Sequence, residues 1–400
     1  MSRIAVIGSG PGAFYTIKYL LKHHSNISVT ILERLVTPFG LVRFGVAPDH
    51  AEVKEVGTEF ANILMSHKTQ VKMHTNQYVG GDLFKLLRES FDGILVATGA
   101  QSAARLPFKS LPQNTLSARD FVLWYNGHPD FAHLRLPDQP RNVSIVGHGN
   151  VALDVARMLS KSKSELEPLV SSGLLNPMAF NWFCRRQALE GPKSVSILGR
   201  GGYLHAAFTN KEFRELTTMK DATCKVNQDE LEASFSELKT RAANDRAKSR
   251  GLSILEKCVS NSRDDSKSNS IFLRFNCKPV EYQGDPAVSL VVSRTLTGET
   301  EHVSCDLGIE SIGFKVMNDF GLPIDSKTGG IAHDGLGRVS GFPGVYVAGW
   351  SKRGPRGVIA ANIPCCIETA EAMFADLSDP SKLPKPNQEP PVFSDPYTPS

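Results

Sequence analysis

The sequence predicts an α/β protein with two Rossmann-like, doubly wound dinucleotide-binding domains, the second inserted in the first. Residues 3–13 and 143–152 carry this prediction, because each is a short apolar run followed by a Gly-x-Gly-x-x-Ala motif. A further apolar run at 344–349, which also ends at glycine, indicates a late return to the first domain. The expected boundaries are 1–103 and 336–378 for the first domain, 104–335 for the second, and 379–400 for a proline-rich tail.

The first apolar run, residues 3–7, predicts a buried parallel strand that turns at once into a helix. Gly8 permits the tight turn, Gly10 lets the backbone approach a pyrophosphate, and Ala13 keeps the helix close to the strand. The N–H groups and the dipole at the start of this helix favour an anion. We therefore expect a pyrophosphate at the start of the helix.

A second strand is expected at residues 27–32, and it ends at Glu33. This acid follows the motif by about 20 residues, where a carboxylate accepts the ribose hydroxyls of a dinucleotide. Strand, helix, second strand and acid stand in the order that the motif requires, so we predict a dinucleotide site. The alternative is a glycine turn in an α/β protein that binds no nucleotide.

The second motif repeats this pattern, with Gly147 and Gly149 at the turn and a helical pattern at 153–159. Two such sites in one chain imply electron transfer between two cofactors. The companion strand, residues 194–198, is followed by Gly199-Arg200 rather than by an acid. A base in this place favours the 2′-phosphate of NADP, whereas NAD favours Asp or Glu. The alternative is a solvated arginine at a strand end.

The composition excludes several classes of protein. The 400 residues are 41% hydrophobic and 22% charged, which is typical of a globular protein with two domains of ordinary size. The formal net charge of +4 argues against a nucleic-acid-binding protein. No run of 18 or more apolar residues occurs, so no membrane-spanning helix is predicted.

The seven cysteines form no Cys-x-x-Cys pair. This spacing excludes structural zinc, iron–sulfur and redox-active dithiol frameworks, and we predict no metal site. The adjacent Cys365 and Cys366 are most simply two small buried residues, with a redox role as the alternative. The chain opens on its first strand, so we expect it to carry no presequence or signal peptide.

The segments outside the two motifs are less informative. Residues 38–50 contain glycines and prolines that forbid a regular helix, and their apolar content suggests that they cover a flat group. The last twenty residues are proline-rich, and we expect them to be extended or disordered. We expect helices at 51–66, 82–89 and 358–376, a polar helix at 228–250, strands at 70–74, 93–99, 271–276, 287–295 and 308–314, and a flexible loop at 260–270.

Longer stretches are more specific than the glycine motifs. They read PFGLVRFGVAPDH at 38–50, GNVALDVAR at 149–157, GW at 349–350 and KRGP at 352–355. On these stretches the chain resembles the adrenodoxin reductase family, the mitochondrial NADPH–ferredoxin reductases, over nearly its whole length. Residues 125–129 are similar to those of fungal members.

The resemblance implies FAD in the first domain and NADPH in the second. Glu33 would hold the FAD ribose, and Arg200 and Glu212 would lie around the 2′-phosphate. The residues implied for FAD are Gly8, Gly10, Gly12, Ala13, Glu33, Leu41, Val79, Gly349, Trp350, Gly357, Val358 and Ile359. Those implied for NADPH are Gly147, His148, Gly149, Asn150, Val151, Arg200, Gly201 and Glu212.

The chain departs from the family in three places. The family usually has a second arginine where Gly201 follows Arg200. The first motif reads Gly-Pro-Gly-Ala where the family has Gly-Pro-small-Gly, and both orders satisfy the packing requirement. The tail is shorter than usual and the presequence is missing, which bears on location and partner docking more than on chemistry.

The chemistry that the resemblance implies is hydride transfer from NADPH to the flavin, followed by single-electron transfer to a [2Fe-2S] ferredoxin. Cofactors carry this chemistry, while the protein supplies position and electrostatics. His50 and Asp154 are the polar candidates for exchanging or relaying a proton where nicotinamide and flavin meet. The alternative is a hydrogen-bonded loop histidine and an aspartate that caps local backbone.

The ferredoxin partner would be acidic, so we expect a local basic face despite the small net charge. The alternative is an ordinary solvated helix surface. The resemblance also implies a role in iron–sulfur cluster, haem or sterol and P450 metabolism, on the matrix side of mitochondria and peripheral to the inner membrane. The candidate docking residues are Arg214, Arg241, Arg246, Lys248 and Arg250.

Two other functions fit a chain with two dinucleotide sites. One is an NADPH-dependent flavin oxidase or monooxygenase, and the other is a redox-sensing protein that binds dinucleotides to change its interactions. Rapid NADPH-dependent reduction of a ferredoxin with little peroxide would distinguish a reductase from both.

Overall fold

The computed structural model describes residues 1–227, 230–231, 240, 245–261, 267–379, 381–394 and 396–397. The chain divides into two compact units. Unit 1 comprises Met1–Val46, His50–Ser102 and Gly313–Ser400, and unit 2 comprises Ala47–Asp49 and Ala103–Ile312. The insertion of one unit in the other, expected from the sequence, is therefore present.

Unit 1 is built on a parallel five-stranded sheet with the strand order β16-β4-β1-β2-β3. Alternate residues of β1 face opposite sides, so that Ile4 and Val6 belong to one apolar cluster and Ala5 and Ile7 to another. The strands are β1 (Ser2–Ile7), β2 (Ile27–Leu32), β3 (Val71–His74), β4 (Gly93–Val96) and β16 (Val345–Val347).

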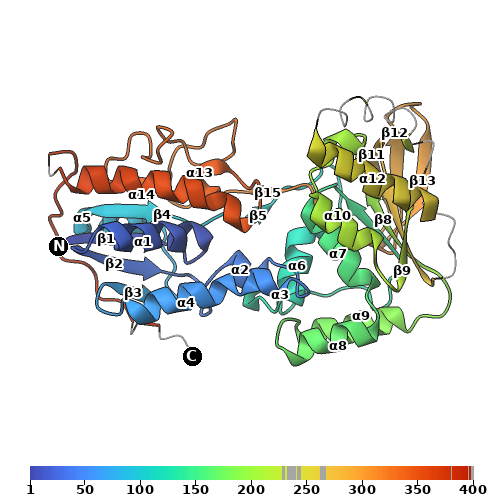
Figure 1. Ribbon diagram of the computed structural model, residues 1–400, viewed down its shortest axis with the longest axis horizontal. Coiled ribbons are helices and arrows are strands. Elements are labelled where there is room, and N and C mark those ends of the chain that lie inside the picture. The colour runs from blue at the N-terminus through green and yellow to red at the C-terminus, as the bar shows by residue number, and fades with distance from the viewer. Residues whose placement is uncertain are drawn as a thin grey trace. The chain divides into compact units, whose positions relative to one another are not determined.

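Helices cover both faces of this sheet. Figure 1 shows α1 between α14 and α4, and these three helices share the cluster of Ile4 and Val6, where the rings of Phe14 and Phe60 stack with centroids 4.6 Å apart. Helix α5 covers the other face through Phe84. The helices of unit 1 are α1 (Pro11–His23), α2 (Leu41–Phe44), α3 (Ala51–Lys54), α4 (Val56–Ser66), α5 (Gly81–Ser90), α13 (Trp350–Arg353), η3 (Ile359–Asn362) and α14 (Ile363–Leu377).

Unit 2 repeats this architecture on a parallel six-stranded sheet with the order β6-β14-β7-β8-β10-β9. An antiparallel sheet of β11, β12 and β13 packs on its Val146 and Leu198. The strands are β6 (Thr115–Ser117), β7 (Asn142–Val146), β8 (Lys193–Leu198), β9 (Ala222–Val226), β10 (Asn269–Arg274), β11 (Cys277–Gly284), β12 (Ala287–Arg294), β13 (Thr300–Ser304) and β14 (Leu307–Glu310). The helices are α6 (Ala118–Tyr125), η1 (Pro129–Phe131), α7 (Asn150–Ser160), α8 (Lys163–Ser171), α9 (Pro177–Gln187), η2 (Tyr203–His205), α10 (Asn210–Thr217) and α12 (Arg246–Asn261).

The predicted fold class is confirmed, but the chain returns to unit 1 at Gly313 rather than at residue 336. The physical reason is apolar packing. Phe320, Leu322 and Ile331 lie in the cluster under α5, where the rings of Phe320 and Phe84 have centroids 5.0 Å apart. The short strands β5 (Ser102–Ala103) and β15 (Phe314–Lys315) pair where the chain passes from one unit to the other.

Other segments differ from expectation in detail. The segment expected to contain no regular helix holds one helical turn, α2, which follows Gly40 at φ +50°. The helix expected at 51–66 is divided at Glu55 into α3 and α4. Most of the polar helix expected at 228–250 lies outside the described residues. Residues 230, 231 and 240 are helical, and α12 begins at Arg246. Within the loop expected at 260–270, residues 262–266 likewise lie outside them.

The tail was expected to be extended or disordered, and its described part is extended along unit 1. The Tyr397 amide donates to the Met73 carbonyl at 2.6 Å, and the Asn387 amide donates to the Glu89 carbonyl at 2.9 Å. Phe393 packs on the apolar cluster of α5. Main-chain hydrogen bonds and one aromatic anchor therefore hold a segment whose composition favours disorder.

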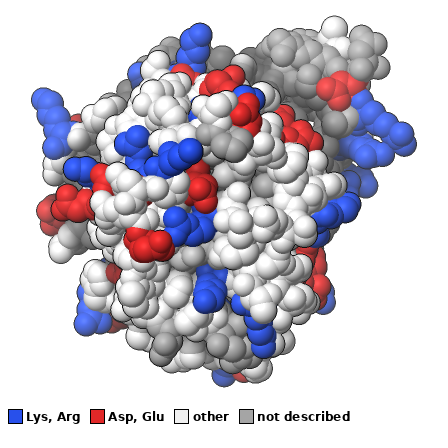
Figure 2. All heavy atoms as spheres, turned by 90° about the vertical axis from the view of Figure 1, so that its left-hand side faces the viewer, with Lys and Arg blue, Asp and Glu red and all other residues white. Residues whose placement is uncertain are grey.

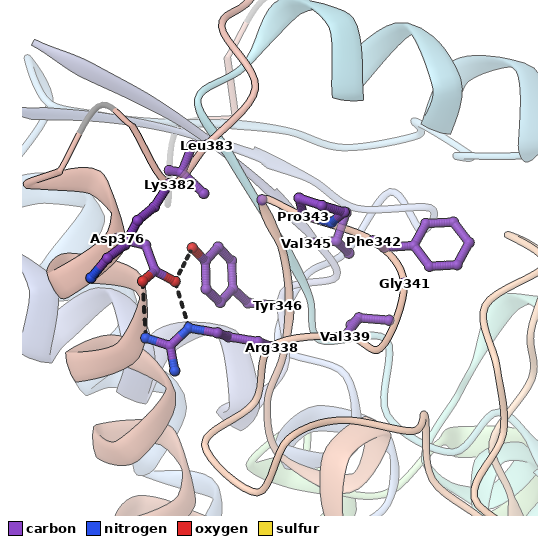
Figure 3. A pocket seen from close by; sticks show the side chains of 11 residues that line it. Arg338, Val339, Gly341, Phe342, Pro343, Val345, Tyr346, Asp376, Lys382 and Leu383 are labelled. Carbon is purple, nitrogen blue, oxygen red and sulfur yellow. Dashed lines mark hydrogen bonds and ion pairs between the residues drawn. The ribbon is translucent and has the colours of Figure 1, made fainter.

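A half-buried ion pair joins Arg338, which precedes β16, to Asp376 near the end of α14. Figure 3 shows Arg338 and Tyr346 converging on Asp376. The Arg338 Nε and Nη2 atoms donate to the carboxylate at 2.6 and 3.0 Å, and the Tyr346 hydroxyl donates to it at 2.9 Å. Burial and the bond to this carboxylate raise the pKa of Tyr346, so its hydroxyl stays a donor.

We expect Tyr346→Phe to lower the free energy of unfolding by about 1 kcal/mol, because it removes one hydrogen bond and leaves Arg338 on the carboxylate. Asp376→Ala should lower it at least twice as much, because it leaves the buried Tyr346 hydroxyl without an acceptor. Urea denaturation of the two variants beside the parent measures both values. Equal effects would show that the ion pair contributes nothing beyond the tyrosine bond.

Candidate functional site

The two glycine motifs form the same turn, at the carboxyl end of β1 in unit 1 and of β7 in unit 2. Gly8 has φ +98°, and a Cβ there would lie 2.7 Å from the Ala97 carbonyl oxygen. Gly147 has φ +129°, and a Cβ there would lie 2.1 Å from the Ser311 carbonyl oxygen. Both positions therefore require glycine, for conformation and for space.

The second glycine of each motif faces open space. A Cβ at Gly10 or at Gly149 would meet no described atom within 4 Å. Each of these glycines is the N-cap of the following helix, and neither supplies a side-chain capping bond. The first N–H groups of α1 and α7 are thus available to an anion, which is the arrangement that holds a pyrophosphate.

Glu33 is held at the end of β2 by its neighbours. Its Oε2 accepts hydrogen bonds from the Ser9 hydroxyl at 2.6 Å and the Ser9 amide at 3.1 Å, and its Oε1 accepts one from the Leu35 amide at 2.9 Å. A carboxylate has about four acceptor sites, so capacity remains for a ribose hydroxyl. Ser9 was missed by sequence reasoning, although its place inside the motif is a usable signal.

The third position of the first motif explains its departure from the family pattern. A Cβ at Gly12 would lie 3.2 Å from the Ala348 carbonyl oxygen and 3.3 Å from the Gly349 Cα. Gly349 in turn has φ +66°, and its Cβ would lie 3.0 Å from the Gly12 Cα. The start of α1 and the end of β16 therefore meet backbone to backbone. The glycine that the family places last in the motif stands here one position earlier, at Gly12.

Two buried polar atoms near this contact lack partners among the described residues, namely Trp350 Nε1 and Asn362 Oδ1. Asn362 Oδ1 lies 4.0 Å from the Cβ position of Gly349. An unpartnered buried donor and acceptor require a ligand or water. Their presence beside the end of β16 fits a polar cofactor bound at the carboxyl edge of this sheet.

The remaining residues expected at the first site differ in exposure. Val79 is buried in the apolar cluster of α5 and Leu41 is half-buried. Val358 is 51% exposed, so its side chain is accessible to a ligand or to a partner protein. Ser351, which sequence reasoning missed, accepts a hydrogen bond from the Gly99 amide at 2.8 Å and joins the ends of β4 and β16.

In the second site the His148 ring packs against the end of β8. Its Nε2 lies 3.4 Å from the Ile197 carbonyl oxygen, and a Cβ at Gly199 would lie 2.2 Å from its Nδ1. Burial lowers the pKa of His148 to about 4, so the ring is neutral at physiological pH. The residue is thus placed at the motif as predicted, with its side chain in a structural position.

Helix α10 is tied to the second motif by Asn150, whose Oδ1 accepts the Thr209 amide at 2.8 Å. This bond fixes the N-cap of the helix that carries Glu212. Glu212 is buried, and its Oε2 has no hydrogen-bond partner among the described residues. A buried carboxylate oxygen without a donor fits a bound ribose or another hydroxyl-bearing ligand.

A positively charged residue, Arg200, follows the end of β8. Arg200 is exposed, and its guanidinium forms no ion pair or hydrogen bond with any residue that the structure describes. Val151 is half-buried and packs against the core of unit 2. The predicted 2′-phosphate site thus has one available arginine, and the residue after it is Gly201.

The two proton-transfer candidates belong to different units, His50 to unit 1 and Asp154 to unit 2. The Asp154 carboxylate accepts a hydrogen bond from Arg157 Nη2 at 2.8 Å. Arg157 also forms a bidentate pair with Asp49, at 2.6 and 3.0 Å. Sequence reasoning missed both pairs of Arg157, although an arginine three residues after Asp154 on a helix is a signal for the pair with Asp154. The role of His50 and Asp154 in exchanging or relaying a proton stays a prediction.

The predicted docking residues come from α10 and α12, which pack against each other. Arg214, Arg246 and Arg250 are exposed. Arg246 and Arg250 are four residues apart on α12 and share a helix face. Arg241 lies outside the described residues, and so does the side chain of Lys248.

Other features of the described residues can be compared with this site. Within the described ranges, no three metal-ligating side chains cluster and no helix is long and apolar enough to cross a membrane. A cavity of about 390 Å³ is lined by Arg338, Phe342, Tyr346 and Lys382 (Figure 3). It lies at the amino end of β16, whereas open parallel sheets bind ligands at the carboxyl ends of their strands.

The cysteines are free thiols throughout. Cys365 and Cys366 are buried at the start of α14, as expected, and the Cys366 thiol lies 3.5 Å from the Gly12 carbonyl oxygen. A hydrogen bond from Cys366 lowers the pKa of Cys365 to about 7, and a backbone bond with Gly349 acts in the same direction.

Comparisons with known proteins agree with the predicted resemblance. Residues 2–215 match the pyridine nucleotide-disulphide oxidoreductase family. The NADPH:adrenodoxin oxidoreductases of Arabidopsis thaliana and Bos taurus are both 34% identical, over 94% of this chain and over 82% and 79% of their own lengths. A fungal relative, the probable NADPH:adrenodoxin oxidoreductase of Schizosaccharomyces pombe, is also 34% identical, over 93% of this chain and 82% of its own.

Solved structures show the same relation. The structure of FprA from Mycobacterium tuberculosis in complex with NADPH has a TM-score of 0.85 and 31% identity, over 95% of this chain and 85% of that one. Thioredoxin reductase from Lactococcus lactis has a TM-score of 0.53 at 16% identity, over 95% of this chain and 100% of that one, and shares the fold alone.

Because the second glycine of each motif faces open space, its substitution by alanine should separate binding from stability. Gly149→Ala should leave the melting temperature within about 2 °C of the parent but weaken NADP⁺ binding at least about tenfold, since the methyl group blocks the approach of phosphate to the backbone. Gly10→Ala should act in the same way on FAD retention.

Gly147→Ala is the matched control, because its Cβ would lie 2.1 Å from the Ser311 carbonyl oxygen and must disturb the fold. Thermal unfolding together with nucleotide binding distinguishes the three variants. Undiminished NADP⁺ affinity in Gly149→Ala would show that the second motif does not hold a pyrophosphate.

Proposed function

Because the chain belongs to the NADPH:adrenodoxin oxidoreductase family, within the pyridine nucleotide-disulphide oxidoreductases, we propose that it transfers electrons from NADPH through FAD to a [2Fe-2S] ferredoxin. The enzyme is an FAD-dependent NADPH oxidoreductase. The ferredoxin, the binding residues and the location are the parts that we infer for this chain.

The observation that carries the proposal is the pair of equivalent glycine turns, one in each unit. Each has a positive-φ glycine packed on a neighbouring strand end and a second glycine that faces open space. The strand beside the first turn, β2, is followed by Glu33, which suits an unphosphorylated ribose. The strand beside the second turn, β8, is followed by Gly199 and Arg200, and an arginine there suits a 2′-phosphate. We therefore assign FAD to unit 1 and NADPH to unit 2.

The chain's own residues bind and orient. Bound FAD supplies the conversion between two-electron hydride chemistry and single-electron delivery. The first N–H groups of α1 and α7 hold the pyrophosphates, and Glu33, positioned by Ser9, holds a ribose. The buried atoms Trp350 Nε1 and Glu212 Oε2 complete their hydrogen bonding with the nucleotide in their own unit.

Arg157 has a positioning role in this proposal. It pairs with Asp49 at 2.6 Å and with Asp154 at 2.8 Å, both within unit 2. Asp49 immediately precedes His50 in the chain, so the pair fixes the backbone from which His50 continues. His50 and Asp154 then remain our candidates for holding or relaying a proton between the two cofactors.

The partner site that we propose is the basic surface of α10 and α12, made of Arg214, Arg246 and Arg250. Among the described residues none of the three side chains forms an ion pair, so their charge is available to an acidic protein. Figure 2 shows, for comparison, an end of unit 1 where basic and acidic side chains are interspersed. Such a mixed surface gives little electrostatic steering.

The location and pathway rest on the relatives. Several are named mitochondrial, which supports a mitochondrial location for this chain. We propose further that it acts on the matrix side, at the surface of the inner membrane. A matrix ferredoxin that serves iron–sulfur cluster, haem or sterol synthesis is the partner consistent with that location. The FprA relatives from Mycobacterium tuberculosis are the named exception to a mitochondrial context.

We expect Arg200→Ala to raise KM for NADPH about tenfold or more, because it removes a charge-assisted hydrogen bond to the 2′-phosphate. KM for NADH should stay nearly unchanged, since NADH has no phosphate there. Steady-state kinetics with both coenzymes measure the effect. Equal losses with NADPH and NADH would remove Arg200 from the phosphate site.

Charge reversal on the basic surface should slow ferredoxin reduction. Arg214→Glu combined with Arg250→Glu should raise KM for ferredoxin at least about tenfold at low ionic strength, and the difference from the parent should shrink as salt is added. Reduction of a small uncharged dye by the same variant should match the parent, because hydride transfer to FAD does not involve this surface.

Lys278→Glu, an exposed charge reversal on β11 in the same unit, is the matched control. It should leave ferredoxin kinetics close to those of the parent. If the control and the α10 and α12 variant behave alike, net charge rather than a specific surface governs the encounter.

A further inference from the structure

The loop that follows β8 contains glycines with histidine rings beside them. The His148 ring fills the space beside Gly199, as described above. At Gly201 a Cβ would lie 3.0 Å from the Cβ of His205, 3.3 Å from its Cγ and 3.4 Å from its Nδ1. The His205 side chain therefore occupies the place into which a side chain at residue 201 would project.

His205 is exposed at the end of the one-turn helix η2. Its amide donates to the Gly202 carbonyl at 3.0 Å, while its ring forms no hydrogen bond or ion pair with any part of the chain that the structure describes. Arg200, five residues earlier, is equally without such a partner. Two basic side chains of one loop thus lack an anion.

Other charged side chains near this loop do have partners of opposite charge. Glu230 is fully buried and pairs with Arg274 at 2.6 Å and Arg294 at 3.0 Å. Glu301 completes this cluster at 2.7 Å from Arg274. Since these acids already hold two arginines of their own, the unpartnered bases of the β8 loop are distinct in needing an external anion.

The place of this loop identifies the anion. In a dinucleotide-binding sheet, the residues after the second strand face the adenosine ribose, and bases there recognise a 2′-phosphate. A phosphate monoester carries about two negative charges and three acceptor oxygens, more than one guanidinium satisfies. A second donor is therefore expected, and Gly201 cannot supply one from a side chain.

We propose that His205 is a specificity-determining residue, whose imidazole donates to the 2′-phosphate of NADPH in the place left open by Gly201. The proposal rests on the use of NADPH by unit 2. Other titratable groups around the loop stay neutral, because burial lowers the pKa of His148 to about 4 and raises the pKa of Tyr203 to about 12. Arg200 and His205 then share the recognition of the phosphate.

The test compares two probes that differ only in the 2′-phosphate, 2′,5′-ADP and 5′-AMP. Their dissociation constants are measured by calorimetry on the FAD-loaded chain. We expect His205→Gln to weaken 2′,5′-ADP about tenfold and to leave 5′-AMP within about twofold. His205→Arg should restore the affinity for 2′,5′-ADP.

A double variant tests the shared place directly. Gly201→Arg alone must displace the His205 ring, whereas Gly201→Arg with His205→Ala places an arginine where that ring has been removed. We expect the double variant to bind 2′,5′-ADP more tightly than either single variant. Strictly additive effects would show that the two positions do not compete for one phosphate.

Two results would overturn the proposal. Equal weakening of both probes by His205→Gln would place His205 on the adenosine, and unchanged binding of both would remove it from the site. Reduction of the bound flavin by NADPH in the parent chain is measured first. Its absence would contradict the proposed function itself, whereas its presence with unchanged probe binding would contradict only the role of His205.

Discussion

A single geometric constraint governs each unit, which is that a buried strand must turn into a helix without a side chain at the corner. At Gly8 and Gly147 the adjoining strand end approaches so closely that no Cβ fits. This approach aligns the carboxyl ends of neighbouring strands, and it directs the first amides of α1 and α7 toward the same edge. The cofactor edge, the sheet order and the placement of Glu33 and Arg200 all follow from that corner.

The polar groups around these corners divide into two kinds. Some form their hydrogen bonds within the protein and hold the backbone in place. Glu33 accepts hydrogen bonds from Ser9 and Leu35, and Asp154 accepts one from Arg157. Others, such as Trp350 Nε1 and Glu212 Oε2, are buried and lack partners among the described residues. A buried polar atom without a partner is costly, so the second kind marks where a ligand completes the structure.

Sequence patterns predicted the fold and the two corners because both depend on local chemistry. Apolar runs, glycines at fixed spacing and an acid or a base at a strand end are properties of short segments. The return to unit 1 at Gly313 was misplaced because it depends on Phe320 and Leu322 packing under α5, a contact between residues distant in sequence. The order in the tail has the same origin, since Tyr397 bonds to Met73.

The residues of the candidate site also divide into those that local sequence predicts and those that depend on contacts between distant parts of the chain. Gly12 looked like an irregular motif and is explained by the end of β16, more than three hundred positions later in the chain. Gly201 looked like the loss of an arginine, and only the structure shows the His205 ring beside it. The Arg157 pair with Asp49 joins a helix to a loop far away in the sequence. Side-chain partners of this kind are determined by tertiary packing, which local patterns do not contain.

The central claim is that one chain holds two different dinucleotides, FAD in unit 1 and NADP(H) in unit 2. Equilibrium binding of NADP⁺ to protein purified with its flavin measures this most directly, with flavin content determined on the same sample. The account predicts one FAD per chain and one further NADP⁺ site that free FAD does not displace. A chain that binds a single dinucleotide, for which FAD and NADP⁺ compete, would contradict it.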